Sequence, residues 1–158
     1  MKRIFSPWRM KYIQKHEEHQ DCIFCAGLMR EDGPENLILA RGKKAFVMLN
    51  RFPYTSGHLM VVPYEHEATI EDLDEGTRAE MMELINHAMG VLRIVYGPQA
   101  FNLGANIGAA AGAGVADHVH FHVVPRWVGD SNFMSTVAET RVLPEELSET
   151  YQRIKKNW

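Results

Sequence analysis

Three histidines alternate with bulky apolar residues in the segment His-Val-His-Phe-His-Val-Val-Pro at residues 118–125. Successive side chains of a β-strand point to opposite faces, so His118, His120 and His122 are expected on one face. The intervening valine and phenylalanine side chains would lie on the other face, where they can pack on a core. Neighbouring histidine β-carbons would lie about 6.5–7 Å apart, which is two strand rises. The segment therefore predicts a rigid row of imidazoles along one side of a sheet.

The chemistry of histidine makes this row a candidate functional site. Histidine is the side chain whose unperturbed pKa lies near neutral pH, and it serves as nucleophile, acid, base or metal ligand. A solvated strand face that happens to carry histidines is the alternative explanation. Since chemistry is the usual reason for concentrating histidine in this way, we favour a functional role.

Five short apolar segments of the chain are expected to be strands. The first two are separated by Arg-Gly-Lys-Lys at residues 41–44, which is typical of a hairpin, and the third is closed by Pro63. The predicted strands are residues 36–40, 45–49, 58–63, 100–106 and 117–126.

Two further segments have the pattern of helices. In residues 75–96 apolar side chains recur at spacings of three and four, and Gly97-Pro98 ends the run. A C-terminal helix is expected from about residue 143 to residue 156. Strands that are mostly sequential, with one long helix inserted late, predict an α+β fold with an antiparallel sheet of about five strands. The apolar stripe of the long helix is interpreted as core rather than as a binding groove, and it consists of Met81, Met82, Ile85, Met89, Leu92 and Val95.

Length, charge and hydropathy restrict the class of protein. The chain has 158 residues, which suits one domain spanning residues 1–158. A net charge of −3 without a clustered Lys/Arg stripe argues against nucleic-acid binding. The N-terminus does not have the pattern of a secretory signal, and no window approaches the ~18–20 continuous apolar residues of a membrane span. We therefore expect a cytoplasmic protein without nucleic-acid or membrane partners, in which Cys22 and Cys25 stay reduced.

The histidine row and two upstream segments together resemble the histidine triad superfamily, whose signature is His-x-His-x-His-x-x with apolar residues at x. Residues 49–53 and 57–66 are similar to the upstream half of the nucleotide pocket of that family. Asn106 and the glycine-rich turn at residues 108–114 lie where the family places its phosphate-handling segment. The resemblance covers roughly residues 20–135. It implies the same α+β fold, with helices packed on the sheet, and usually a homodimer.

The resemblance also implies roles for the histidines. The middle histidine, His120, would attack the α-phosphorus of a nucleotide and become nucleotidylated. A neutral imidazole is able to attack phosphorus when its other nitrogen is held as a donor to a carbonyl, which fixes the tautomer. His122 and His58 would then stabilise the non-bridging oxygens as hydrogen-bond donors. For His58, a histidine satisfied by a backbone carbonyl is the alternative.

Further residues are expected to contact substrate. Asn50 matches the family position that binds the ribose hydroxyls, and a turn-forming asparagine is the alternative. Small residues around Gly112 and Gly114 would let backbone N–H groups approach a phosphate, and Asn106 precedes them. Arg126 is a candidate to hold the departing polyphosphate or an incoming phosphate, with a surface turn as the alternative. An apolar purine slot would draw on Phe24, Phe46 and Leu49, which are equally well explained as core.

Cys22 and Cys25 form a Cys-x-x-Cys pair, and two thiolates need two more ligands to hold tetrahedral zinc. Zinc-bearing members of the superfamily use positions that match His66 and His118. The resemblance thus implies structural zinc, with His118 as a ligand rather than a catalyst, and no organic cofactor. Free, half-buried cysteines without metal are the alternative, and a redox pair is a more distant one.

Two segments resemble bacterial histidine triad proteins related to diadenosine tetraphosphate phosphorylases, namely residues 6–12 and 125–134. Many hydrolases of the superfamily carry Gly-Gln-[Ser/Thr] before the first histidine, whereas this chain has Gly-Ala-Gly-Val-Ala-Asp at residues 112–117. The resemblance thus implies cleavage of an adenine dinucleotide at the α-phosphorus, with inorganic phosphate favoured over water as acceptor. A nucleoside phosphoramidate hydrolase and a non-catalytic nucleotide-binding protein are the alternatives.

Overall fold

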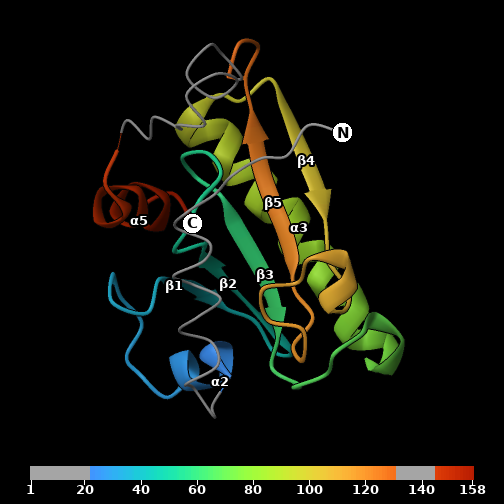
Figure 1. The fold of residues 1–158 in the computed structure, drawn as a ribbon. Coiled ribbons are helices and arrows are strands. Elements are labelled where there is room, and N and C mark those ends of the chain that lie inside the picture. The colour runs from blue at the N-terminus through green and yellow to red at the C-terminus, as the bar shows by residue number, and fades with distance from the viewer. Residues whose placement is uncertain (1–21, 131–144) are drawn as a thin grey trace.

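The computed structural model describes residues 22–130 and 145–158 (Figure 1). Five strands form one antiparallel sheet in the order β1-β2-β3-β5-β4, which confirms the predicted α+β fold. The strands are β1 (Ile38–Arg41), β2 (Ala45–Leu49), β3 (Leu59–Pro63), β4 (Ala100–Gly104) and β5 (Phe121–Arg126). The helices are α2 (Ile23–Leu28), α3 (Glu75–Tyr96) and α5 (Leu147–Lys155), with short 3₁₀ turns η1 (Ile70–Asp72) and η2 (Ala109–Ala111). The segments 6–12 and 131–134, used above as points of resemblance, lie outside the described residues.

The first strand begins later than predicted. Leu37 has a φ of 63°, a left-handed conformation that a regular strand does not contain, so β1 starts at Ile38 rather than at residue 36. The side-chain oxygen of Asn36 accepts hydrogen bonds from the N–H groups of Gly33 and Ile38 and holds this bend in place. The predicted hairpin between β1 and β2 is confirmed.

The strand that carries the histidines is shorter than predicted. In the pairing of β3 with β5, Val61 lies opposite Phe121, so two residues further on the register would place Pro63, which has no N–H to donate, opposite Val119. The N–H of Val119 instead donates to the carbonyl of Glu67, 2.7 Å away. Consequently β5 begins at Phe121, and only His122 of the three histidines lies within the ladder. The fourth strand also ends earlier than predicted, at Gly104, where it pairs with His122.

The long helix has the boundaries that the sequence predicts. Asp74 caps its N-terminus by accepting from the N–H of Thr77, and Gly97 ends it with a φ of 56°. Most of the apolar stripe packs on the sheet, but Met82 is 49% exposed and its assignment to the core was wrong. Met82 follows Met81, which is buried, and adjacent helical positions lie about 100° apart around the axis.

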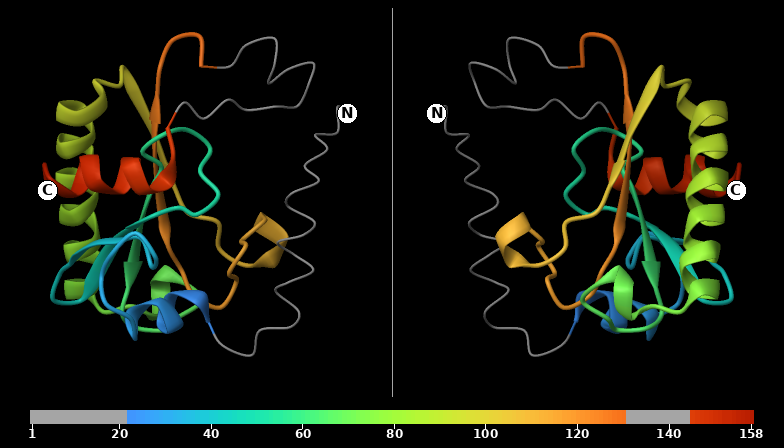
Figure 2. Two further views of the ribbon diagram at one scale, coloured as in Figure 1. Left: turned by 90° about the vertical axis from the view of Figure 1, so that its left-hand side faces the viewer. Right: turned by 90° about the vertical axis from the view of Figure 1, so that its right-hand side faces the viewer.

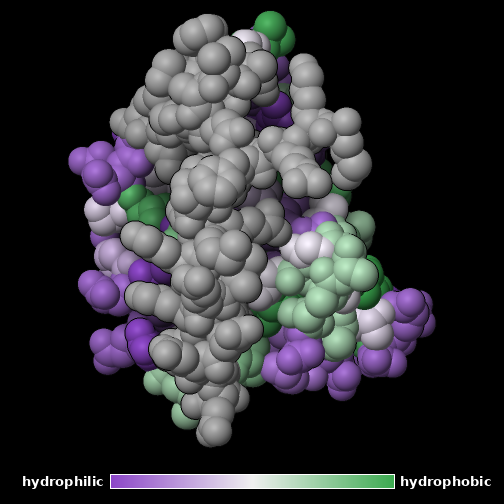
Figure 3. Space-filling view, viewed as in Figure 1, coloured by the Kyte–Doolittle hydropathy of each residue, from purple (hydrophilic) through white to green (hydrophobic). Residues whose placement is uncertain are grey.

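The two faces of the sheet carry different layers (Figure 2). Alternate strand residues, among them Val47, Val61 and Val123, pack with α3 and α5 on one face. The residues between them, such as Phe46 and Met60, pack with α2 and Val115 on the other. The loop that holds η2 also stands on this second side (Figure 2), and its surface is pale green at the lower right of Figure 3, as expected for alanine.

The C-terminal helix covers the outer edge of β1. The predicted helix began at residue 143, whereas α5 begins at Leu147, and residues 143 and 144 lie outside the described part of the chain. Tyr151 donates its hydroxyl to the carbonyl of Ile38, and Lys155 donates to that of Leu39. These bonds satisfy backbone groups that an edge strand otherwise leaves open. Among the described residues, no helix is long and apolar enough to cross a membrane.

Candidate active site and metal centre

The alternation predicted for the histidine row holds even though its first half is outside the ladder. Val119, Phe121 and Val123 belong to the core beneath α3, so the three histidines face the opposite side of the sheet. His118 is fully buried and His120 is 4% exposed. The row therefore lies on the side that also carries α2 and the loop of η2.

His120 is held in the tautomer of a nucleophile. Its Nδ1 lies 2.9 Å from the carbonyl oxygen of His118. A carbonyl only accepts, so Nδ1 must carry the hydrogen and the lone pair must be on Nε2. Burial lowers the pKa of His120, which keeps the ring neutral at pH 7. A neutral imidazole with a free Nε2 lone pair is the form that attacks an electrophile.

His58 and His122 form a hydrogen-bonded pair beside His120. Nε2 of His58 lies 3.0 Å from Nδ1 of His122, and the rings of His120 and His122 meet edge to face at 4.9 Å. Burial, followed by the neighbouring His120, lowers the pKa of His122 to about 4. His122 is thus a neutral ring at physiological pH, and any hydrogen bond that its ring donates comes from an uncharged donor.

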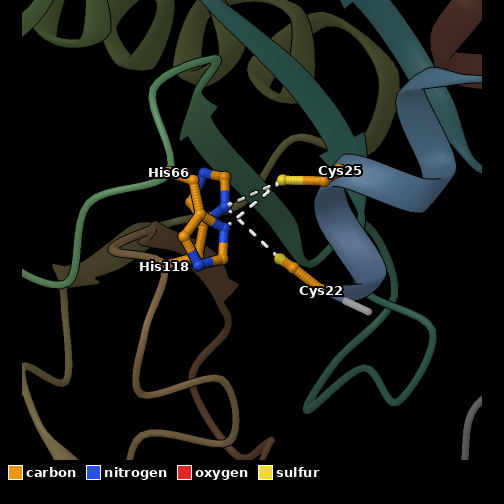
Figure 4. A group of neighbouring side chains, drawn as sticks. All are labelled: Cys22, Cys25, His66 and His118. Atoms are coloured by element: carbon orange, nitrogen blue, oxygen red, sulfur yellow. Dashed lines mark hydrogen bonds between the residues drawn. The ribbon is translucent and has the colours of Figure 1, made fainter. Parts of the chain in front are cut away.

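Four side chains far apart in the sequence meet at one end of the histidine row (Figure 4). They are Cys22 at the N-cap of α2, Cys25 within α2, His66 after β3 and His118 before β5, with ligand atoms all within 4.8 Å of one another. Nδ1 of His118 lies 3.4 Å from Sγ of Cys22 and 3.7 Å from Sγ of Cys25, which lies 3.3 Å from Nδ1 of His66. Bond lengths of about 2.3 Å to sulfur and 2.0 Å to nitrogen place tetrahedral zinc ligands about 3.5 Å apart. The group therefore has the composition and the spacing of a zinc site.

The tautomer of His118 also fits a metal ligand. Its Nε2 donates to the carbonyl of Pro63 at 2.9 Å, so the lone pair is on Nδ1, which faces the sulfurs. Burial and the adjacent Cys22 raise the pKa of Cys25, because two neighbouring thiolates repel each other. A divalent cation would relieve that repulsion. Of the two sequence-based explanations for these cysteines, the geometry favours the metal site over free thiols.

The side chain of Phe24 packs against both His118 of the candidate metal centre and His120. It is 2% exposed, and its ring lies 5.2 Å from that of His118 and 4.9 Å from that of His120. The other two candidates for a purine slot are core: Phe46 stacks on Tyr64, and Leu49 packs beneath α3. The sequence offered no sign of the short helix α2 that brings Phe24 here.

The residues predicted to bind ribose and phosphate differ in what holds them in place. The side-chain oxygen of Asn50 accepts a hydrogen bond from the N–H of Phe52, as expected of a turn. The side-chain NH₂ group of Asn50 takes no part in that bond. Gly108 and Gly112 have φ values of 80° and 85°, so the turn before the histidines depends on glycine. Asn106 is half-buried at the start of this turn, and Gly114 is exposed near its end.

The side chain of Arg126 binds Asp130 and Asn102 at the end of β5. Its guanidinium forms a bidentate ion pair with Asp130 at 2.6 and 2.7 Å and also donates to Asn102. It lies four residues beyond His122 on β5, roughly 13 Å along the strand. The arrangement is that of the surface turn that was the alternative for this residue.

Comparison with known proteins identifies the family. The family model described as HIT domain matches residues 32–128. The chain belongs to the HIT family. An AP-4-A phosphorylase of Mycobacterium tuberculosis is 36% identical over 165 residues, with 100% of this chain and 85% of the relative covered. An adenosine 5'-monophosphoramidase of Schizosaccharomyces pombe is 31% identical over 134 residues, covering 80% of this chain and 96% of the relative.

Solved structures agree with this assignment. A Zn-bound histidine triad family protein from Mycobacterium smegmatis superposes with a TM-score of 0.69 at 25% identity, covering 87% of this chain and 92% of the other. A histidine triad nucleotide-binding protein from Sulfolobus tokodaii gives the same TM-score and identity, covering 86% and 91%. The predicted family and fold are thereby confirmed, as is the expectation of a nucleotide-processing enzyme.

The low pKa of His122 predicts how stability depends on pH. A histidine of an unfolded chain titrates near 6.5, whereas His122 in the folded protein titrates near 4. Between these values only the unfolded chain binds the proton, so the free energy of unfolding should fall as the pH is lowered through this window. Urea titrations at several pH values from pH 7 to pH 4 measure this free energy of unfolding. His122→Asn should reduce the slope of this free energy against pH, and equal slopes in the wild-type and variant proteins would contradict the prediction.

Proposed function

We propose that this protein cleaves diadenosine tetraphosphate at the α-phosphorus by way of a nucleotidylated His120, with inorganic phosphate as the favoured acceptor. The observation that carries the proposal is the hydrogen bond from Nδ1 of His120 to the carbonyl of His118, which leaves a neutral ring with its lone pair on Nε2. A nucleotide-binding protein without catalysis has no need of a histidine prepared in this way.

The reaction proceeds in two displacements. Nε2 of His120 attacks the α-phosphorus, a nitrogen–phosphorus bond forms, and the phosphorus–oxygen bond to the departing ATP breaks. His122 donates to a non-bridging oxygen as negative charge accumulates there. An oxygen of inorganic phosphate then attacks the same phosphorus, and the nitrogen–phosphorus bond breaks to release ADP and restore His120. Asn50 binds the ribose, while Asn106 and the turn with Gly112 and Gly114 receive the phosphates.

Two observations support phosphate over water as the acceptor. The residues just before the histidine row, Gly-Ala-Gly-Val-Ala-Asp at 112–117, contain no hydroxyl side chain. The relative from Mycobacterium tuberculosis is named a phosphorylase, and all of this chain aligns with it. Phosphoramidate hydrolysis is the second candidate, because the relative from Schizosaccharomyces pombe is a monophosphoramidase.

Product analysis tests the proposal. Diadenosine tetraphosphate incubated with inorganic phosphate should give ATP plus ADP over many turnovers. Without phosphate the reaction should stop after one ATP per active site, because the second displacement then lacks its nucleophile. ATP plus AMP in both conditions would mean a hydrolase. Slow reaction in both, with rapid cleavage of an adenosine phosphoramidate, would establish the second candidate.

His120→Ala should lower kcat by several orders of magnitude and leave nucleotide affinity nearly intact, because the intermediate and the transition state lose their nucleophile while the ground state does not. Asn50→Ala should mainly raise KM, since ribose contacts are made equally in both states. His87→Ala, on the exposed side of α3, is the matched control. Activity retained in His120→Ala would refute the covalent mechanism.

We further propose that Cys22, Cys25, His66 and His118 hold one structural zinc ion per chain. The spacing of the four ligand atoms and the tautomer of His118 support this assignment. The ion would fix α2 to the segments that follow β3 and precede β5, and it would supply no step of the reaction. A reducing cytoplasm, the compartment predicted from the sequence, would keep both thiols available as ligands.

Elemental analysis of protein purified without added metal should give one zinc per chain. His66→Ala should bind less zinc, melt at a lower temperature and expose both thiols to titration, because three ligands hold the ion less tightly. Alanine at His87, which is not near the cluster, should retain the full zinc content. Metal-free, active wild-type protein with freely titratable thiols would exclude the site.

The protein is also proposed to be a homodimer. β4 is the last strand of the sheet, it pairs on one side with β5, and most of its residues are exposed, including Leu103 at 45%. An apolar edge strand with exposed residues is suited to pairing with a second copy. Sedimentation equilibrium at micromolar concentration should give the mass of two chains, and Leu103→Lys should shift it toward one. A wild-type monomer would refute the proposal.

A further inference from the structure

Tyr54 lies against the histidine pair although nothing in the sequence marked it. Its backbone N–H donates to Nδ1 of His58 at 3.1 Å. Its ring lies 4.6 Å from the ring of His58 and 6.1 Å from that of His122, nearly parallel to the latter at 27°. A single residue therefore contacts both members of the pair, one of them through a hydrogen bond with a fixed direction.

The direction of that bond determines where the protons of the pair are. A peptide N–H only donates, so Nδ1 of His58 must offer a lone pair, and the hydrogen of the neutral ring is on Nε2. That Nε2–H donates to Nδ1 of His122, 3.0 Å away, which must then also offer a lone pair. The hydrogen of His122 is consequently on its Nε2.

We propose that Tyr54 is a positioning residue, whose peptide N–H sets the tautomer of His58 and, through His58, makes His122 present an Nε2–H donor to the substrate phosphate. His58, with both ring nitrogens engaged, acts through His122 instead of contacting phosphate itself. The inference rests on the proposed function only for its catalytic consequence, because the proton positions are a property of the free protein.

The consequence concerns the leaving group. A second proton on Nδ1 of His58 would point at the N–H of Tyr54, so the pair resists becoming cationic and remains a neutral donor. The low pKa of His122, caused first by burial, agrees with this. A neutral donor stabilises charge on phosphate oxygens without giving up its proton. Such a donor suits a polyphosphate, which departs as a stable anion, better than an amine, which must be protonated to leave.

Nitrogen-15 NMR of histidine-labelled, full-length protein tests the tautomers directly, since protonated and bare imidazole nitrogens resonate far apart. His58 and His122 should each show a bare Nδ1 and a protonated Nε2, whereas His120 should show the reverse. A protonated Nδ1 in His58, or a bare Nε2 in His122, would overturn the proposal. This readout needs no substrate, so it is independent of whether diadenosine tetraphosphate is turned over.

The role of the N–H is tested by replacing Tyr54 with its α-hydroxy acid analogue, which changes the peptide N–H to an ester oxygen and keeps the side chain. The pair should lose its single tautomer, and kcat should fall about tenfold, the effect of one hydrogen bond, with little change in KM. The same replacement at Tyr64 is the control, because the N–H of Tyr64 donates to the carbonyl of Lys44, away from the pair. It should lower stability comparably but leave tautomers and kcat unchanged.

Tyr54→Ala removes the ring and retains the peptide N–H, so it should keep the native tautomers. A scrambled pattern in Tyr54→Ala would attribute the effect to ring packing and overturn the assignment to the N–H. An unchanged pattern in the ester variant would overturn it as well. Should the ester variant not fold, the spectra of the native protein and of Tyr54→Ala still decide the question.

Discussion

The arrangement of the whole site depends on the three hydrogen-bonding groups of His118. Its Nε2 donates to the carbonyl of Pro63 at the end of β3, its Nδ1 faces the two cysteine sulfurs, and its backbone carbonyl accepts from His120. The sheet, the candidate metal centre and the nucleophile thus meet at one buried residue. A displacement of His118 would move two of its own groups together, namely Nδ1, the candidate metal ligand, and the carbonyl that fixes the tautomer of His120. The candidate metal centre and His120 are therefore structurally coupled.

Burial alone cannot give neighbouring imidazoles different tasks. It lowers the pKa of His118, His120 and His122 alike and makes each of them a neutral ring. What distinguishes them is the backbone or side-chain atom that each meets. A carbonyl opposite Nδ1 leaves the lone pair on Nε2, as in His120, and an N–H donor opposite Nδ1 leaves the hydrogen on Nε2, as in His122. The same residue type therefore supplies a candidate metal ligand, a candidate nucleophile and a candidate donor within one short segment.

Much of the fold and of the histidine row could be predicted from the sequence, because these features depend on periodicity and on the identity of side chains. The period of two at residues 118–123 predicted which side chains share a face, and the period of the long helix with Gly97-Pro98 predicted its boundaries. The positions of strand ends were less accessible. They depend on Leu37 adopting a positive φ and on Pro63 reaching the pairing position opposite Val119, which only the register reveals.

Contacts within turns, and contacts between segments distant in sequence, were not predictable in the same way. The ion pair of Arg126 with Asp130 and the approach of Tyr54 to the histidine pair arise from turn geometry, on which the apolar pattern gives no information. The cysteine pair was recognised by its spacing, but its position beside His118 depends on the short helix α2. A helix of this length has almost no periodic signal, and its packing through Phe24 stabilises it.

The tautomers also bear on the identity of the acceptor. Hydrolysis of a nucleotidylated histidine requires a base to take a proton from water. In the proposed intermediate, Nε2 of His120 would be bonded to phosphorus, and Nε2 of His122 would still carry the hydrogen that a polyphosphate leaving group does not remove. An amine leaving group would take that hydrogen and so create a base for the water that follows, whereas ATP leaves the donor protonated. A phosphate dianion needs no base, because its oxygens are nucleophilic as they stand, and backbone N–H groups of a glycine-rich turn favour binding an anion over water. The same neutral donor that suits a polyphosphate leaving group in the first displacement therefore favours phosphate in the second.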